Sequence, residues 1–279
     1  MNVAEFSAAV FLISAAAGFL GALTGLGGGV VITPVLTLLF HVDIRYAIGA
    51  TLVSVIATSS GAAAAFVREG FSNVRIGMFL EIATASGAVI GALLTSVIPT
   101  SSLGMIFGAM LLYSAYLTGR THQDGPSREQ QPDPLAVRLK MNSTYPGPAG
   151  PVAYAVRGVK SGFGLMFVAG TVSGLLGIGS GALKVIAMDR VMRIPFKVST
   201  TTSNFMIGVT AAASAGFYLS RGYIDPGLAM PVMLGVLAGS LAGARILVGA
   251  KTRALRLVFA AVVGVLAIEM IYNAFAGRI

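Results

Sequence analysis

Lys184 is the residue of this chain with the clearest potential for chemistry, because it is the one charge in an apolar stretch from about residue 161 to 188. Inside a membrane, a lysine costs about 3 kcal/mol or more unless a partner or solvent compensates it. Asn204 is a second candidate, since a buried amide is hard to satisfy by internal hydrogen bonds alone. Both side chains donate hydrogen bonds, so they indicate the binding of an anion.

Two glycine clusters interrupt long apolar segments: residues 25–29 read GLGGG and residues 177–181 read GIGSG. Each glycine costs a helix about 1 kcal/mol relative to alanine, so the clusters predict breaks in the helices. Each cluster is followed by about a dozen apolar residues, enough for half a membrane. A half-helix that begins at such a break presents free N–H groups and its positive dipole end to a cavity, which favours an anion.

Close packing of helices is the alternative explanation for glycine in a membrane span. We prefer it for the pairs Gly87 with Gly91 and Gly239 with Gly243, which lie in long uninterrupted spans. For the two clusters, packing alone explains the composition less well, because three to four glycines within five residues exceed what packing requires.

Hydroxyl side chains follow each glycine cluster along the chain. Thr51 and Ser54 share a helical face in the first half, and Ser203 precedes Asn204 in the second. Hydroxyls can donate to sulfonate-like oxygens, but they can also bond to the carbonyl four residues earlier or hold helices together, and both readings stay open. The predicted substrate-binding residues are Gly25, Gly27, Gly28, Gly29, Thr33, Thr51, Ser54, Gly177, Gly179, Ser180, Gly181, Lys184, Ser203 and Asn204.

Acidic residues that could carry a proton through the membrane are few. Glu81 lies inside an apolar block and is the candidate for proton coupling, whereas pairing near the membrane surface explains Asp189 and Glu269. Two histidines and no cysteine exclude thiolate chemistry, disulfides and a His-rich metal site. No catalytic cluster of side chains lies in the spans, so neither an enzyme nor a cofactor is expected.

The composition places the chain in a membrane. Charged residues make up 10%, against about 25% in a soluble domain, and the mean hydropathy is +0.86. The net charge of +9 does not indicate nucleic acid, because the basic residues fall mostly between apolar blocks. Glu5 stands where a signal peptide would carry basic residues, so a cleaved signal peptide is not expected.

The two halves of the chain are related by an internal repeat. A shift of 152 residues aligns 17–118 with 169–270 without a gap and pairs seven glycines. We therefore predict a first transmembrane repeat at 1–118, a polar linker rich in Pro and Gly at 119–158, and a second transmembrane repeat at 159–279. The linker is expected to be a mobile surface segment on the cytoplasmic side.

The basic residues predict how the halves are oriented. If each glycine-broken segment is a hairpin that returns to its starting side, one side carries only Arg45, Arg221 and Arg278. The other side then carries Arg68, Arg75, Arg120, Arg128, Arg138, Lys140, Arg157, Lys160, Arg190, Arg193, Lys197, Lys251, Arg253 and Arg256. A single crossing per segment would remove this bias. The positive-inside rule thus favours hairpins, inverted repeats and both termini outside.

The sequence also resembles a known family. The paired glycine motifs, the Ala50-Thr51-Leu52 stretch and the string PFKVSTTTSNFMIGVTAAASA at 195–215 are similar to the sulfite exporter TauE/SafE family. The likeness covers both halves but not the linker. It implies an inner-membrane permease for small sulfur oxyanions or organosulfonates, often in the export direction. It also implies site residues at Gly25 to Gly29, Pro34, Thr51, Gly177 to Gly181, Ser203 and Asn204. Ile186 stands where the second half would match Pro34, so exact equivalence of the half-sites is not expected.

The expected fold class is an all-α integral membrane protein of two inverted repeats, each a glycine-broken helical hairpin followed by three transmembrane helices. The expected function is a secondary transporter in the inner (plasma) membrane that exports small sulfur-containing anions such as sulfite or sulfoacetate by alternating access. The alternative is a proton-coupled permease for another small carboxylate or oxyanion, and a non-transporting assembly subunit is less favoured. The partners are the anion and the lipid bilayer, with protons and a homo-oligomer left open.

Overall fold

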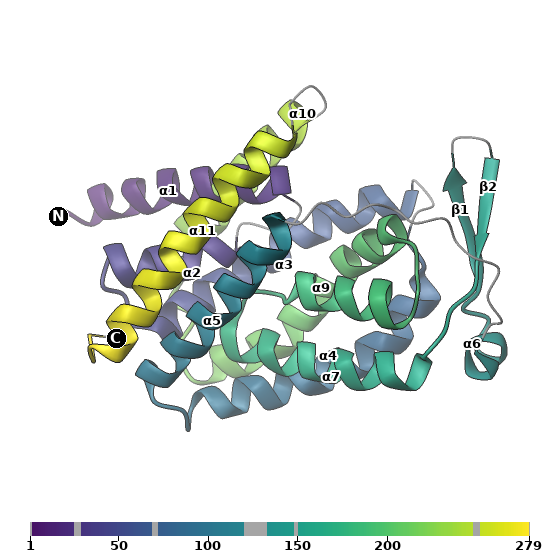
Figure 1. Ribbon diagram of the computed structural model, residues 1–279. Helices are drawn as coiled ribbons and strands as arrows, with labels where there is room; N and C mark the ends of the chain where they lie inside the picture. Colours follow the sequence, from purple (N-terminus) through teal and green to yellow (C-terminus); the bar gives the residue numbers. More distant parts are fainter. Residues whose placement is uncertain are drawn as a thin grey trace.

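Helices dominate the computed structural model, which describes residues 2–24, 29–68, 72–119, 133–147, 150–247 and 252–278. The elements are α1 (Val3–Thr24), α2 (Gly29–Leu39), α3 (Ile44–Arg68), α4 (Val74–Thr95), α5 (Thr100–Gly119), α6 (Pro134–Arg138), β1 (Ser143–Gly147), β2 (Gly150–Tyr154), α7 (Val159–Leu176), α8 (Gly181–Ile186), the π-helix η1 (Ala187–Val191), α9 (Phe196–Ser220), α10 (Pro226–Leu247) and α11 (Thr252–Phe275). Their arrangement is shown in Figure 1.

Several helices have the length and apolarity of membrane spans. In the described part of the chain, the windows Ala4–Gly21, Val74–Thr95, Val159–Leu176 and Pro226–Gly243 are long and apolar enough to cross a bilayer. The helices α3, α5, α9 and α11, with 20 to 25 residues each, pack among them. Side chains such as Leu12, Ile82 and Ile268 are more than 60% exposed, as expected for residues that face lipid rather than water. The chain is thus a multi-pass membrane protein, as predicted.

The helices of the second half repeat those of the first at a spacing of 152 residues, which α1 and α7 share at their last residues and the other pairs at their first. α3 and α9 correspond at both ends after a shift of 152 residues, and so do α4 and α10. The contacts between halves are reciprocal as well, since α1 packs on α10 and α7 packs on α4. Figure 1 shows α5 and α11, another corresponding pair, lying along each other. The sequence repeat therefore reappears as a repeat of helices.

Glycines set the close approach of the helices that pair between halves. A Cβ atom at Gly87 of α4 would lie 2.2 Å from the carbonyl oxygen of Phe167 in α7, and one at Gly239 of α10 would lie 1.9 Å from that of Ala15 in α1. At Gly91 the corresponding distance to the Thr171 carbonyl is 2.0 Å. No side chain fits at these positions, so packing explains these three glycines, as their spacing predicts.

The central helices α3 and α9 run in opposite directions. Gly49, early in α3, lies against Tyr223 just beyond the end of α9, whereas Ser59, later in α3, lies against Gly208 in the middle of α9. Contact positions rise in one helix while they fall in the other, which defines an antiparallel pair. α4 and α7 are parallel by the same test, since Gly87 meets Phe167 and Gly91 meets Thr171.

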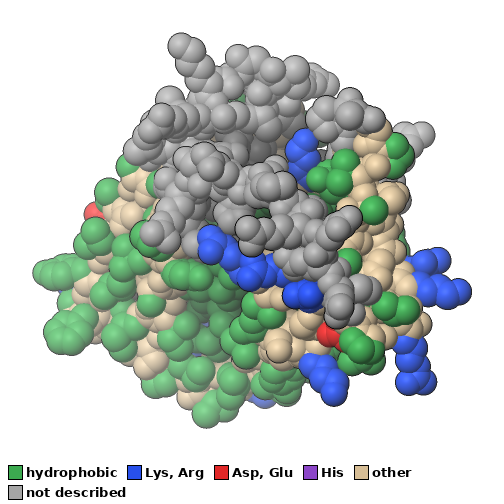
Figure 2. All heavy atoms as spheres, turned by 45° about the vertical axis from the view of Figure 1, so that its right-hand side comes forward, with side chains coloured by type: hydrophobic (Ala, Val, Ile, Leu, Met, Phe, Trp, Pro, Cys, Tyr) green, Lys and Arg blue, Asp and Glu red, His purple; other side chains and the backbone are tan. Residues whose placement is uncertain are grey.

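Connecting segments gather at two ends of the bundle. At the termini end, Arg45 donates to the carbonyls of Thr95 and Ile98 at 3.3 and 3.2 Å, and a pocket is lined by residues that include His41 and Arg278. Figure 1 shows both chain termini at this end and the β1–β2 hairpin at the opposite one, the hairpin end. Exposed basic residues on the segments of the hairpin end are Arg75, Arg138, Lys140, Arg157, Lys160, Arg190, Arg193 and Lys197. In Figure 2, hydrophobic side chains cover the lower left of the view, and most Lys and Arg side chains lie from its centre to its right.

The second part of the expected mobile linker is folded, which corrects that expectation. Residues 133–147 and 150–158 contain α6 and an antiparallel pair of strands in which Ser143 is paired with Tyr154. Asn73, the N-cap of α4, donates to the Met141 carbonyl at 3.0 Å and to the Tyr154 hydroxyl at 2.7 Å. Burial raises the pKa of the Tyr154 phenol, so this acceptor stays neutral. The strands are also a departure from an all-α fold, and the Pro and Gly content concealed them.

Candidate functional site: a helix break and a buried charge pair

The second glycine cluster breaks its helix, as predicted. α7 ends at Leu176 and α8 begins at Gly181. Between them the backbone takes positive φ angles of +68° at Gly177, +71° at Gly179 and +43° at Ser180. Left-handed angles strain any residue with a Cβ atom, so the two glycines are required by the turn itself. In the first half, α1 ends at Thr24 and α2 begins at Gly29. The predicted site residues Gly25, Gly27 and Gly28 lie outside the described residues.

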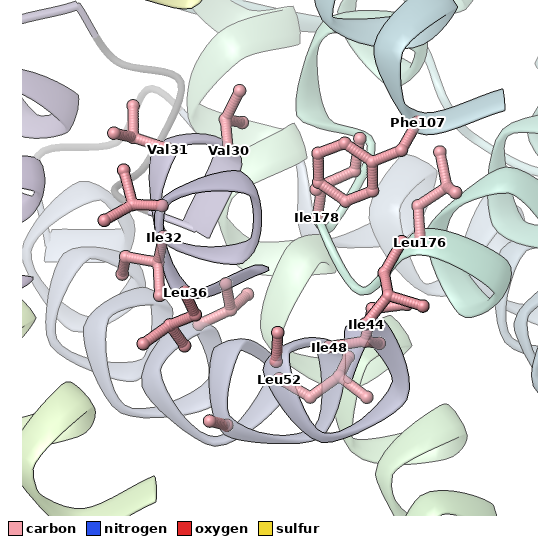
Figure 3. Close-up of a cluster of buried hydrophobic side chains, with 14 of the residues drawn as sticks. Val30, Val31, Ile32, Leu36, Ile44, Ile48, Leu52, Phe107, Leu176 and Ile178 are labelled. Carbon is pink, nitrogen blue, oxygen red and sulfur yellow. The ribbon is translucent and has the colours of Figure 1, made fainter. Parts of the chain in front are cut away.

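The carbonyl groups that the break exposes are bonded to a buried tyrosine. The Tyr218 hydroxyl lies 3.0 Å from the Gly174 carbonyl and 3.2 Å from the Leu175 carbonyl, at the C-terminus of α7. It also lies 2.9 Å from the Thr95 hydroxyl. Around this turn, Figure 3 shows Ile178 and Leu176 near Phe107 of α5. The break therefore lies in a packed environment, and the Gly174 and Leu175 carbonyls at the end of α7 have hydrogen-bond partners.

The starts of α2 and α8 lie close to the crossing of α3 and α9. A Cβ atom at Gly29 would lie 2.7 Å from Val55 Cγ2 in α3, and one at Gly181 would lie 2.8 Å from Ile207 Cδ1 in α9. Gly179 lies near both, since a Cβ atom there would be 2.8 Å from Ile207 Cγ2 and 3.5 Å from Val55 Cγ1. Val55 and Ile207 are themselves separated by 152 residues, so the two half-sites meet at equivalent positions.

Lys184 and Glu81 are joined by a hydroxyl group. Lys184, in α8, is fully buried and its Nζ donates to Thr210 Oγ1 of α9 at 2.5 Å. Thr210 Oγ1 in turn donates to Glu81 Oε1 of α4 at 2.7 Å. The other carboxylate oxygen, Glu81 Oε2, is buried with no hydrogen-bond partner among the described residues. This arrangement, the Glu81–Thr210–Lys184 relay, connects the anion candidate with the proton candidate and spans both halves.

Hydroxyls in the first half bond mainly to one another and to backbone. Thr33 Oγ1 of α2 lies 2.8 Å from Thr51 Oγ1 of α3, and Thr51 also donates to the Ala47 carbonyl at 2.8 Å. Ser54 donates to the Thr51 carbonyl at 2.8 Å. All three are buried, so here the hydroxyls fasten α2 to α3.

Two buried hydroxyls near the second break keep unused hydrogen-bonding capacity. The Ser180 hydroxyl, only 2% exposed, has no partner in the described ranges, and neither has the Ser173 hydroxyl. Ser203 donates to the Gly181 carbonyl at 3.3 Å. Asn204 is half-buried and shares a helical face with Ile207 and Gly208, which contact the second break and α3. The second half thus offers donors beside the break.

The dipole of α8 contributes less to an anion site than its sequence suggests. The α-helical part has six residues and continues as the π-helix η1, so few peptide dipoles are aligned. Lys184 therefore carries the positive charge of this site. Within the described part of the chain, no three His, Asp or Glu side chains are grouped so that they could hold a metal ion.

Sequence reasoning did not foresee the role of Thr210. Thr210 follows the second glycine cluster in sequence, but it lies 129 residues from Glu81 and 26 from Lys184 along the chain. No spacing within one helix could have revealed a bridge between three helices. The hydrogen bonds of Tyr218 with Thr95 and with the end of α7 were not predicted, for the same reason.

A bundle of apolar helices with a glycine-broken segment and a buried charge is an architecture typical of membrane transporters. The chain belongs to the family described as "Sulfite exporter TauE/SafE", which matches residues 10–270. The match spans both halves and the segment between them.

Proteins that are similar to this chain over most of its length are named as membrane transporters. The "Probable membrane transporter protein YunE" of Bacillus subtilis is 28% identical to this chain, over 92% of this chain and 94% of the relative. The "Probable membrane transporter protein YdhB" of the same organism is 30% identical, over 85% of this chain and 86% of the relative. A "Probable membrane transporter protein" of Xylella fastidiosa is 24% identical over 94% of both chains. No solved structure matches the chain significantly.

Proposed function

We propose that the protein is a secondary transporter that exports small sulfur-containing anions, such as sulfite or organosulfonates, across the plasma membrane. The observation that carries the proposal is a fully buried lysine, Lys184, beside a helix break in a TauE/SafE bundle. An ammonium in a membrane interior is costly unless it has a partner, and a small anion is a partner that such a site can exchange. Ser180 and Asn204, near the same break, supply further donors.

We further propose that the two halves are inverted repeats that rock against each other. Two observations support this: the helices repeat after 152 residues, and the corresponding helices α3 and α9 run antiparallel. Equivalent helices that point in opposite directions across a membrane are what a twofold axis in the membrane plane produces. The breaks near Val55 and Ile207 would then lie at the axis, where alternating access needs its binding site.

Ligand-dependent stability tests the proposal directly. Sulfite, sulfoacetate, sulfate and acetate are each added to the purified protein in detergent, and thermal unfolding is measured. A transporter of sulfur anions is stabilised by sulfite or sulfoacetate more than by acetate, because a ligand that binds only the folded state raises its stability. Preferential stabilisation by acetate would favour the alternative carboxylate permease, and no shift with any anion would favour an assembly subunit.

Asn204→Ala is expected to lower anion transport by about tenfold or more without changing thermal stability, since the lost donor is a ligand group and not part of the packing. Counterflow of labelled sulfite into proteoliposomes measures the first effect and thermal unfolding the second. Asn273→Ala is the matched control, because the Asn273 amide bonds only to the Glu269 carbonyl of its own helix among the described residues. Equal transport by both variants would remove Asn204 from the site.

The hairpin end is expected to face the cytoplasm, with both termini outside, because exposed basic residues are concentrated there. Single cysteines placed at Lys140 and at Arg278 in this cysteine-free chain test the orientation. In intact cells a membrane-impermeant maleimide should label the cysteine at 278 and spare that at 140 until the cells are broken. The reverse pattern would show the opposite topology.

A further inference from the structure

The Glu81–Thr210–Lys184 relay contains one negative and one positive group and is neutral as a whole. Its three side chains are at most 7% exposed. The Thr210 hydroxyl separates the carboxylate from the ammonium, so each charge keeps room for a second partner. Glu81 Oε2 has no hydrogen bond in the described chain, and Lys184 Nζ has donors beyond the one that Thr210 accepts.

No other charge compensates this pair within the residues that the structure describes. The electrostatic partner of Glu81 is Lys184, and that of Lys184 is Glu81. The elements packed around Glu81 carry their remaining charges at the hairpin end: Arg75 on α4, Lys160 on α7, Lys197 on α9, and Asp189 with Arg190 on η1. All four basic residues among these are exposed, and Asp189 Oδ2 lies 3.9 Å from Arg190 Nε.

The relay has no twin in the first half. A shift of 152 residues places Ile32, Thr58 and Met233 at the positions equivalent to Lys184, Thr210 and Glu81. Thr58 bonds to the Ser54 and Val55 carbonyls of its own helix. Among the described residues, the two halves thus share one buried pair of ionisable groups, which provides for one charge exchange in each transport cycle.

We propose that Glu81 is a proton-binding site that couples one proton to each monovalent anion, so that transport is electroneutral. The proton adds to Oε2 of the carboxylate and gives a neutral acid, while Oε1 still accepts from Thr210. The anion binds at Lys184, whose charge Glu81 no longer balances. With both ligands bound the site is neutral, and with neither bound it is neutral. With only one bound, a net charge would be buried in the membrane, which is costly.

This inference rests on the proposed transport function and changes what would drive it. An electroneutral cycle moves no net charge, so the membrane potential does not act on it. The pH gradient and the anion gradient set the direction. Export then requires an outward anion gradient that exceeds the inward proton gradient, whereas an uncoupled anion would leave along the inside-negative potential.

Proteoliposomes that contain the whole chain test the coupling with radiolabelled methanesulfonate, an anion that stays monovalent over the working pH range. An inside-alkaline pH gradient is expected to drive accumulation, and a potassium diffusion potential set with valinomycin is expected to have no effect. An internal pH dye should report one proton per anion. Uptake that follows the potential without proton entry would overturn the coupling and leave the transport function standing. If neither methanesulfonate nor sulfite enters under any gradient, the transport function fails, and the inference with it.

Glu81→Gln gives a second readout that a structural role would not produce. The amide resembles the protonated carboxyl group, so Lys184 stays available to the anion. We expect pH-driven accumulation to fall by about tenfold or more while exchange of labelled for unlabelled methanesulfonate continues, because exchange needs no proton release. Glu81→Asp, which restores an ionisable group, should recover part of the pH-driven uptake. Full pH-driven accumulation by Glu81→Gln would contradict the proposal.

Discussion

Lys184→Ala is expected to abolish anion transport and to destabilise the protein by about 3–5 kcal/mol. The transport loss follows because the variant removes the positive charge beside the second break. The destabilisation has a separate cause: Glu81, joined to Lys184 through Thr210, would be left as an uncompensated buried carboxylate. Counterflow of labelled sulfite in proteoliposomes measures the first effect, and thermal unfolding in detergent measures the second.

A double variant separates these two effects. Glu81→Gln combined with Lys184→Met keeps similar side-chain volumes and removes both charges, so its stability should return to within about 2 kcal/mol of the parent. Transport should stay absent, since no cation remains for the anion. Transport by the double variant would refute the assignment of Lys184 to the substrate. An isolated Lys184→Met variant as stable as the parent would show that the relay does not hold Glu81.

The positions of the helices were accessible from the sequence because they depend on local physics. Apolar runs of membrane length fix the spans, and glycine at 177 and 179 marks a turn whose positive φ angles suit no other residue well. The repeat of 152 residues then predicted equivalent boundaries, and α3 and α9 have them. The four-residue spacing of Gly87 and Gly91 also predicted that these glycines allow close helix packing, because only glycine leaves room for a neighbouring backbone at such a contact.

The relay and the hairpin were not accessible in the same way. Glu81 and Lys184 were separate candidates, and what joins them is a threonine on a third helix. Such a contact depends on the relative rotation of three helices, which periodicity does not determine. The folded part of the linker was missed because Pro and Gly weaken strand signals, although Met141 and Tyr154 bring apolar surface into contact with the bundle.

The roles of the hydroxyl groups were a third feature that the sequence could not predict. A hydroxyl group such as that of Thr33, Thr51 or Ser203 can bind a ligand or form a hydrogen bond within the protein, so the sequence left both roles open. In the structure Thr33 and Thr51 bond to each other across two helices, whereas the Ser180 hydroxyl at the second break has no hydrogen-bond partner among the described residues. Burial and partner geometry decide between such roles, and neither can be read from residue type.

Gly174→Ala is expected to lower the stability of the folded protein by about 3 kcal/mol, the largest effect we expect from adding one carbon atom. A Cβ atom at this position of α7 would lie 1.9 Å from the carbonyl oxygen of Ala88 in α4. Backbone cannot rotate away as a side chain can, so the two helices must separate along their contact. Thermal unfolding of the purified variant and its yield in membranes measure the loss.

Gly164→Ala is the matched control on the same helix, because a Cβ atom there has nothing within 4 Å. It should leave stability unchanged or raise it by up to about 1 kcal/mol, since alanine is the better helix former. Ala88→Gly should not rescue Gly174→Ala, because the clash is with a backbone oxygen and that change leaves the oxygen in place. Equal stability of the two alanine variants would mean that α4 and α7 do not approach this closely. Rescue by Ala88→Gly would instead place the conflict at the Ala88 methyl group.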